Sequence, residues 1–156
     1  MATFIVRARR FLKQMVSYAD RIREKGRSVN PFFCLMGIDV ARLDKGFAVL
    51  KMEVRPDMMN GAGWLQGGIF TALADEAFAL ALSSEIGPQD GIATISESTT
   101  FIKGVRTGVL LAEGRVIKKG RRVAFTEGYV RADDPEKTLL SKTSAAFAIT
   151  SSRTAG

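Results

Sequence analysis

The sequence of 156 residues contains no histidine and a single cysteine, Cys34. Catalysis by Ser-His-Asp or Cys-His arrangements and zinc sites built on histidine are therefore excluded. A lone cysteine forms neither an intrachain disulfide bond nor a cysteine metal cluster, and Cys34 is expected to be a small core residue. Any catalytic proton transfer must use a carboxylate, a lysine, a tyrosine or a water molecule held by polar groups.

Long hydrophobic runs are also absent. The longest apolar-leaning run without charge, residues 58–74, contains four glycines together with Asn60 and Gln66. This run is too polar to cross a bilayer, which takes about 20 predominantly apolar residues. The N-terminus lacks the apolar region and cleavage site of a signal peptide. We therefore expect a cytoplasmic protein without stable insertion into a membrane.

The net charge of +7 is concentrated at one end of the chain. Residues 1–27 carry eight Lys or Arg and two acidic residues, whereas the rest carry 15 basic and 14 acidic ones. This nearly neutral remainder argues against a nucleic-acid-binding surface. Apolar residues at helical spacing predict a basic amphipathic helix within residues 1–28: Phe4, Ala8, Phe11, Met15, Tyr18 and Ile22. We expect it to dock on its own domain or on a partner subunit, with a membrane surface as the alternative.

Residues 29–151 are expected to form one domain, because the length of the chain suits a single hydrophobic core. A short turn at residues 32–35 and a long helix at residues 67–84 are expected within it. Period-two patterns predict strands at residues 38–42, 48–54, 92–103, 108–118, 122–132 and 138–149. One helix among strands joined by short turns predicts an α+β fold, with an antiparallel sheet wrapped about the helix. Such a sheet leaves a face or an edge for another subunit, so we expect a homo-oligomer.

Asp75 lies inside the most apolar helix of the chain. Hydrophobic side chains occur around almost its full circumference, so the helix should be enclosed on most sides. A carboxylate removed from water prefers to be protonated or to meet a polar reactant. Asp75 is therefore a candidate catalytic residue, and pairing with a basic side chain or a position at the surface is the alternative.

Two adjacent glycines, Gly67 and Gly68, occupy the first turn of this helix. Amide N–H groups there lack intrahelical acceptors, and the helix dipole amounts to roughly half a positive charge. Without side chains, the glycines let a substrate carbonyl approach these amides. One such donor to an oxyanion contributes about 2.7–4 kcal/mol to lowering an acyl-transfer barrier. A tight loop or close helix packing is the alternative explanation.

Several short motifs carry a resemblance to a known family: Gly37-Ile38-Asp39, Gly46-Phe47-Ala48-Val49, Met59-Asn60-Gly61, Gly67-Gly68 and Leu73-Ala74-Asp75. Over residues 35–150 the chain resembles the hotdog-fold acyl-CoA thioesterases, especially those of the PaaI type. The resemblance implies a long central helix wrapped by a curved antiparallel sheet, with sites at a dimer interface and dimers often paired into tetramers. It also implies hydrolysis of acyl-CoA to a carboxylic acid and CoA, without a metal or redox cofactor.

The resemblance also implies roles for individual residues. The Gly67 amide would bind the thioester carbonyl, with Gly68 beside it, and Asp75 would be the nucleophile or the base that activates water. Asn60 would orient water or substrate. On the strand that follows the helix, Thr94 is the candidate that completes the site.

Three further candidates have weaker support. Ser96 is the second candidate after Thr94 on the same strand. Lys118 and Arg121, in a basic turn between two strands, suit the phosphates of CoA, although such a turn is often only solvated. Lys103 and Arg106 are similar candidates.

Gln66 is the main departure from the family pattern, which has histidine at this position. Glutamine forms hydrogen bonds but does not titrate, so any contribution must be positioning. A non-catalytic acyl-CoA-binding protein is therefore the alternative to a thioesterase.

Overall fold

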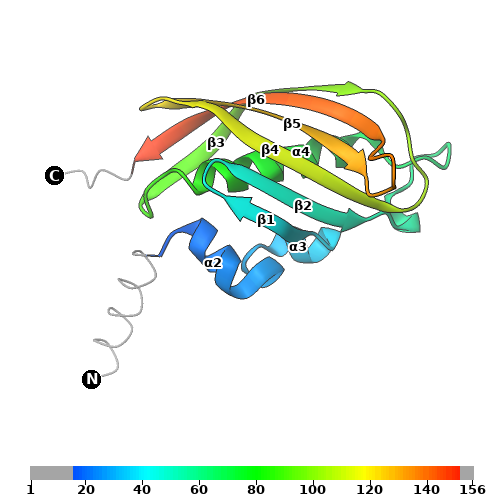
Figure 1. Ribbon diagram of the computed structural model, residues 1–156, viewed down its shortest axis with the longest axis horizontal. Helices are drawn as coiled ribbons and strands as arrows, with labels where there is room; N and C mark the ends of the chain where they lie inside the picture. The colour runs from blue at the N-terminus through cyan, green and yellow to red at the C-terminus, as the bar shows by residue number, and fades with distance from the viewer. Residues whose placement is uncertain (1–15, 152–156) are drawn as a thin grey trace.

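The computed structural model describes residues 16–151, which contain a six-stranded sheet wrapped around one long helix (Figure 1). The helix is α4 (Gly67–Ser83). The strands are β1 (Asp39–Asp44), β2 (Phe47–Glu53), β3 (Asp90–Phe101), β4 (Val109–Lys119), β5 (Val123–Ala132) and β6 (Leu139–Ser151). They are ordered β1-β2-β4-β5-β6-β3, and every neighbouring pair is antiparallel. The predicted α+β architecture is confirmed, with strand ends close to those expected from the period-two patterns.

The core lies between α4 and the inner face of the sheet. Alternate residues of β2 and β4, such as Leu50 and Leu110, are fully buried and point toward the helix. On α4 the fully buried side chains include Phe78, Leu80 and Leu82. They surround the helix almost completely, because the sheet covers one side and N-terminal elements cover another.

Two glycines of the sheet allow α4 to pack closely against it. Gly114 on β4 and Gly128 on β5 are paired in register beneath the helix. A Cβ atom at Gly114 would lie 2.8 Å from the carbonyl carbon of Ala77, and one at Gly128 would lie 1.9 Å from the Glu113 carbonyl oxygen of β4 and 2.7 Å from the Phe78 ring. Neither position has room for a side chain, so the contact between helix and sheet depends on both.

Short helices precede the sheet: α2 (Tyr18–Lys25), η1 (Gly26–Val29) and α3 (Pro31–Met36), with η2 (Pro56–Met58) after β2. On α2, Ala19 and Ile22 are buried, and Ile22 belongs to the main core. The described part of the predicted N-terminal helix therefore docks on its own domain. The part of that prediction on residues 1–15 lies outside the described residues, and the domain boundary after residue 28 stays a prediction.

Helix α3 replaces the turn expected at residues 32–35. Asn30 caps it, because its Oδ1 accepts hydrogen bonds from the backbone N–H groups of Phe32 and Phe33. Phe33 is buried, whereas Cys34 is exposed. The expectation of a core cysteine was therefore wrong, because a short helix buries one side and Cys34 lies on the other.

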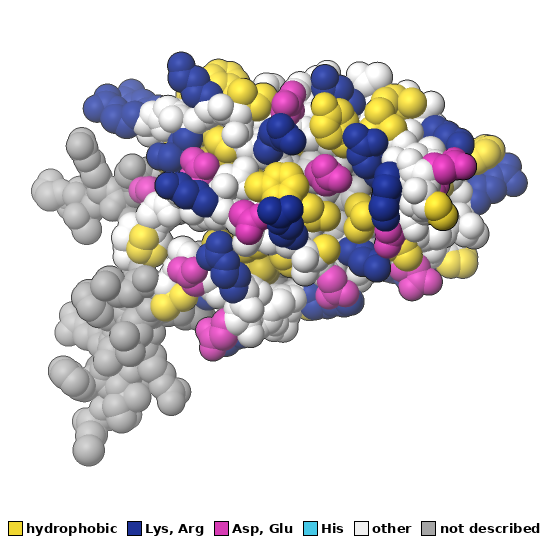
Figure 2. Space-filling model, in the orientation of Figure 1, with side chains coloured by type: hydrophobic (Ala, Val, Ile, Leu, Met, Phe, Trp, Pro, Cys, Tyr) yellow, Lys and Arg dark blue, Asp and Glu magenta, His cyan; other side chains and the backbone are white. Residues whose placement is uncertain are grey.

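Basic and acidic side chains are interspersed over the face shown in Figure 2, as the nearly neutral composition of the domain suggested. Within residues 16–151, no helix is long and apolar enough to cross a membrane.

The close approach of α4 predicts that Gly114→Ala and Gly128→Ala destabilise the fold. Overpacking of this kind typically costs about 1–3 kcal/mol, or about 2–4 °C in Tm for each kcal/mol. Gly68→Ala is the control, because a Cβ atom there meets no atom within 4 Å. Thermal melting should show lower Tm values for the first two variants only, and an unchanged Tm for Gly128→Ala would contradict this packing.

Candidate active site

Asp75 and Thr94 meet between the middle of α4 and the edge strand β3. Thr94 Oγ1 donates a hydrogen bond of 2.9 Å to Asp75 Oδ1. Asp75 is only partly buried. The structure therefore brings together two of the predicted site residues.

Glu97 is a third member of this cluster, and the sequence analysis missed it. It lies on the inner face of β3, where it pairs with the buried Ala145 of β6. Its Oε1 atom is buried without a hydrogen-bond partner among the described residues. Burial, and then the charge of Asp75, raise the pKa of Glu97 to about 7. In a chain without histidine, Glu97 is thus a carboxyl group that titrates near neutral pH.

An irregularity in β3 explains why Glu97 was missed. The register with β6 shifts between Thr94 and Ser96, so strict alternation fails at this point. Thr94 and Glu97 consequently share the inner face, although they are three residues apart. Ser96 instead lines a hollow of about 330 Å³ with the exposed Phe125, away from Asp75. The structure does not bring Ser96 to the cluster.

Glu76, the next residue of α4, extends toward the N-terminal helices. Asn30 Nδ2 donates to Glu76 Oε2 at 3.3 Å and to the Tyr18 hydroxyl oxygen at 2.9 Å. Burial is the main cause that raises the pKa of Glu76, followed by the charge of Asp75. Burial also raises the pKa of Tyr18.

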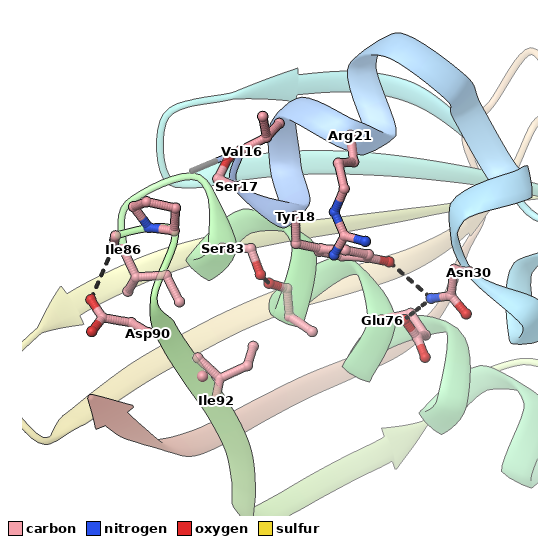
Figure 3. A pocket seen from close by; sticks show the side chains of 14 residues that line it. Val16, Ser17, Tyr18, Arg21, Asn30, Glu76, Ser83, Ile86, Asp90 and Ile92 are labelled. Carbon is pink, nitrogen blue, oxygen red and sulfur yellow. Dashed lines mark hydrogen bonds between the residues drawn. The ribbon is translucent and has the colours of Figure 1, made fainter. Parts of the chain in front are cut away.

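These three side chains belong to a cavity of about 400 Å³, which we call the α2 cavity (Figure 3). It is lined by α2, α4 and the start of β3. Its polar end holds Tyr18, Arg21, Asn30 and Glu76, whereas Val16, Ala79, Ile86, Pro88 and Ile92 provide apolar surface.

A second hollow, of about 280 Å³, lies at the start of α4. It is lined by Asn60, Leu65, Gly67, Phe70, Phe101, Ile102, Lys103 and Gly104. The Phe101 ring lies 3.5 Å from the position of a Cβ atom on Gly67. Gly67 is the first residue of the helix, where N–H groups lack intrahelical acceptors. Asn60 and Gly67 are thus brought together, beside the basic Lys103.

Asn60 also has a structural role. Its Oδ1 accepts hydrogen bonds from the backbone N–H groups of Ala62 and Trp64, at 2.9 and 3.1 Å. Its side-chain oxygen therefore holds the loop that precedes α4. Gln66 occupies the N-cap position without a side-chain capping hydrogen bond, and it is exposed.

Gly67 and Asp75 do not meet within one chain. They are eight residues apart on a continuous helix, which places them about 12 Å apart along its axis. A thioester carbonyl bound at the Gly67 amide is therefore out of reach of the Asp75 of the same chain.

Lys118 and Arg121 lie at the opposite end of the helix from Gly67. The strand that precedes them approaches the C-terminal end of α4, where the Val116 N–H bonds to the Gly46 carbonyl and the Gly46 N–H bonds to Ser84 Oγ. Within one chain they do not join the hollow at Gly67. Gly68 is exposed beside Gly67 and has open space around it.

Comparison with known proteins identifies the family. The sequence profile of the thioesterase superfamily matches residues 62–139, which is half of the chain. The acyl-coenzyme A thioesterase PaaI of Escherichia coli is 36% identical over 90 residues, covering 56% of this chain and 61% of PaaI. The 1,4-dihydroxy-2-naphthoyl-CoA hydrolase of Listeria monocytogenes is 25% identical over 104 residues, covering 67% of this chain and 84% of that one.

Solved structures agree with these matches. A variant of the phenylacetic acid degradation protein PaaI from Thermus thermophilus superposes with a TM-score of 0.69 and 27% identity, covering 76% of this chain and 98% of that one. The chain belongs to the thioesterase superfamily and has the hotdog fold. The resemblance to PaaI-like thioesterases inferred from the motifs is confirmed.

The raised pKa of Glu97 predicts a pH-dependent stability. The folded protein keeps a proton up to about pH 7, whereas the unfolded chain loses it near the ordinary value of 4.5. The stabilising contribution of neutral Glu97 is therefore complete below pH 4.5 and is lost as the pH rises through 7. Thermal melting should show that the Tm of Glu97→Gln, relative to wild type, increases between pH 5 and pH 8.

Thr99→Val is the matched control, because Thr99 lies on the same strand and bonds to Thr71 of α4 at 3.1 Å without titrating. Its Tm difference from wild type should stay constant over this pH range. A constant difference for Glu97→Gln as well would show that Glu97 titrates normally.

Proposed function

We propose that the protein hydrolyses an acyl-CoA thioester to a carboxylic acid and CoA. Membership of the thioesterase superfamily supports the reaction class. The names of two relatives, an acyl-coenzyme A thioesterase and a naphthoyl-CoA hydrolase, support CoA as the thiol. The observation that carries the proposal is a pair of matched contacts between α4 and β3, at Gly67 with Phe101 and at Asp75 with Thr94.

These two contacts suggest how the site is completed. Strand β3 is an edge of the sheet, and its outer backbone groups are available to a second chain. Antiparallel pairing of two copies, with the twofold axis at Ser98 and the extra residue Ile95 of each strand left unpaired, would exchange Thr94 with Phe101. The same axis would place the Gly67 of one protomer against the partner's Asp75. In this homodimer each site combines the Gly67 amide of one chain with the Asp75 carboxylate of the other. The distance between the two groups along one helix then no longer prevents them from acting on the same carbonyl group.

Asp75 and the Gly67 amide would then act on one carbonyl group. The thioester oxygen accepts a hydrogen bond from the Gly67 N–H and gains negative charge as the carbonyl carbon is attacked. Asp75 removes a proton from the attacking water, or attacks the carbon itself to form an anhydride that water hydrolyses. In either route the C–S bond breaks and the CoA sulfur leaves as a thiolate, which takes up a proton.

Basic side chains near the start of α4 suit the phosphates of CoA. Lys103 lines the hollow beside Gly67. Arg106 lies nearby with its guanidinium carbon 4.2 Å from the centre of the Trp64 ring, which fixes its orientation. We prefer this pair to Lys118 and Arg121 for CoA binding, because Lys103 directly lines the hollow that contains Gly67.

The first test is hydrolysis of a panel of acyl-CoA esters by wild type and Asp75→Asn, followed by release of free thiol. Loss of the base or nucleophile should reduce kcat by about 10²–10⁴-fold. Equal rates for the two proteins would contradict the role of Asp75. Stabilisation by acyl-CoA without hydrolysis of any ester would favour the alternative of a non-catalytic acyl-CoA-binding protein.

The amide donor is tested by Gly67→Pro. Proline lacks the N–H group and fits the first position of a helix. Gln66 has ψ 129°, within the range that a following proline prefers. We expect kcat to fall by about 10²–10³-fold with little change in Tm. Gly67→Ala, which keeps the N–H group, should retain far more activity, and equal kcat values for the two variants would contradict the assignment.

A further inference from the structure

The α2 cavity contains a guanidinium group, that of Arg21, which forms no ion pair within residues 16–151. This range includes all 16 Asp and Glu residues of the chain. Among the described residues, Arg21 is the only basic one that lines the cavity. The Arg21 Nε atom is buried without a hydrogen-bond partner in the described part of the chain. A partly desolvated guanidinium in this state favours an anionic ligand.

The orientation of Arg21 is fixed by Tyr18. The Arg21 guanidinium carbon lies 5.7 Å from the centre of the Tyr18 ring. The Tyr18 hydroxyl oxygen already accepts a hydrogen bond from Asn30, so its own proton is free to bond to a ligand. Figure 3 shows these side chains together at one end of the cavity, whereas Asp90 is at the other end, where it accepts from the Gly87 N–H.

The α2 cavity also borders the cluster formed by Asp75, Thr94 and Glu97. Glu76, which lines it, directly follows Asp75 on α4. Ile92, which lines it from β3, lies two residues before Thr94 on the same face of the strand. Ala79 of α4 and Ile92 of β3 provide apolar surface on the side of the cavity nearest to Asp75 and Thr94. A group that enters from the side of Asp75 therefore meets apolar surface and, at the polar end, the donors Arg21 and Tyr18. Beside these donors lies the Glu76 carboxyl group, whose raised pKa favours its neutral form.

On the basis of the proposed thioesterase function, we propose that the α2 cavity binds the acyl group of the substrate and selects acyl chains that end in a carboxylate. The ligand class is the mono-CoA thioester of a medium-length dicarboxylic acid. Its methylene groups contact the apolar wall, and its free carboxylate accepts hydrogen bonds from Arg21 and Tyr18. Because the cavity is separate from the hollow at Gly67, selectivity and catalysis depend on different residues.

The experiment compares adipoyl-CoA with hexanoyl-CoA, which have the same number of carbon atoms and differ only in the terminal carboxylate. Steady-state kinetics of wild type should give a kcat/KM at least about tenfold higher for adipoyl-CoA, as expected for hydrogen bonds to a charged group. Arg21→Met should abolish this preference by lowering kcat/KM for adipoyl-CoA. The readout is the ratio of kcat/KM for the two esters within each variant, so hydrolysis of hexanoyl-CoA need not stay at the wild-type value.

Arg23→Met is the matched control. Arg23 lies on the same helix but is exposed and pairs with Asp20 at 3.0 Å outside the cavity. It should leave both kcat/KM values unchanged. Arg21→Lys keeps the charge without the planar fork and should retain part of the preference, which separates loss of the ligand contact from loss of folding. Thermal melting of all three variants verifies the fold.

The outcomes separate this inference from the proposed function. Equal kcat/KM values for the two esters in wild type, or a preference that persists in Arg21→Met, would overturn the assignment of the cavity while hydrolysis itself stands. Absence of hydrolysis for every acyl-CoA would overturn the proposed function, and this inference with it.

Discussion

The rigidity of α4 is the constraint on which the account of the site depends. A continuous helix holds the Gly67 amide and the Asp75 carboxylate about 12 Å apart along its axis. No rotation of a side chain removes this separation. Sheet packing at Gly114 and Gly128 keeps the helix closely seated, so bending is also opposed. The two chemical functions can converge only if a second chain supplies one of them.

Different side chains of α4 face different neighbouring elements. Toward β3 the helix presents Asp75 to Thr94 and Glu97, at the edge where another sheet can pair. Toward α2 it presents Glu76 to a cavity whose Arg21 forms no ion pair within residues 16–151. Its first residue, Gly67, lines a hollow beside Lys103. The two adjacent acids of this apolar helix therefore lie in different electrostatic surroundings.

Much of this arrangement could be predicted from the sequence, because hydrophobic periodicity defined α4 and most strands. The contact between Asp75 and Thr94 also agreed with the position expected for a polar residue on the next strand. Glu97 was overlooked, and Ser96 lies away from Asp75, since a register shift in β3 reverses which of the two faces the helix. Arg21 was not singled out for another reason: its lack of an ion pair within residues 16–151 depends on tertiary placement, whereas its sequence context suggested only a solvated basic helix.

The most direct test of the account is complementation between Gly67→Pro and Asp75→Asn chains, co-expressed with different tags and purified as hybrids. If each site uses both chains, a hybrid dimer contains one intact site and one doubly defective site. The purified hybrids should then recover about half of wild-type turnover, because one of the two sites in each dimer is intact. Hybrid dimers that are as inactive as the two parent variants would show that the amide and the carboxylate act within one chain, which would contradict the account.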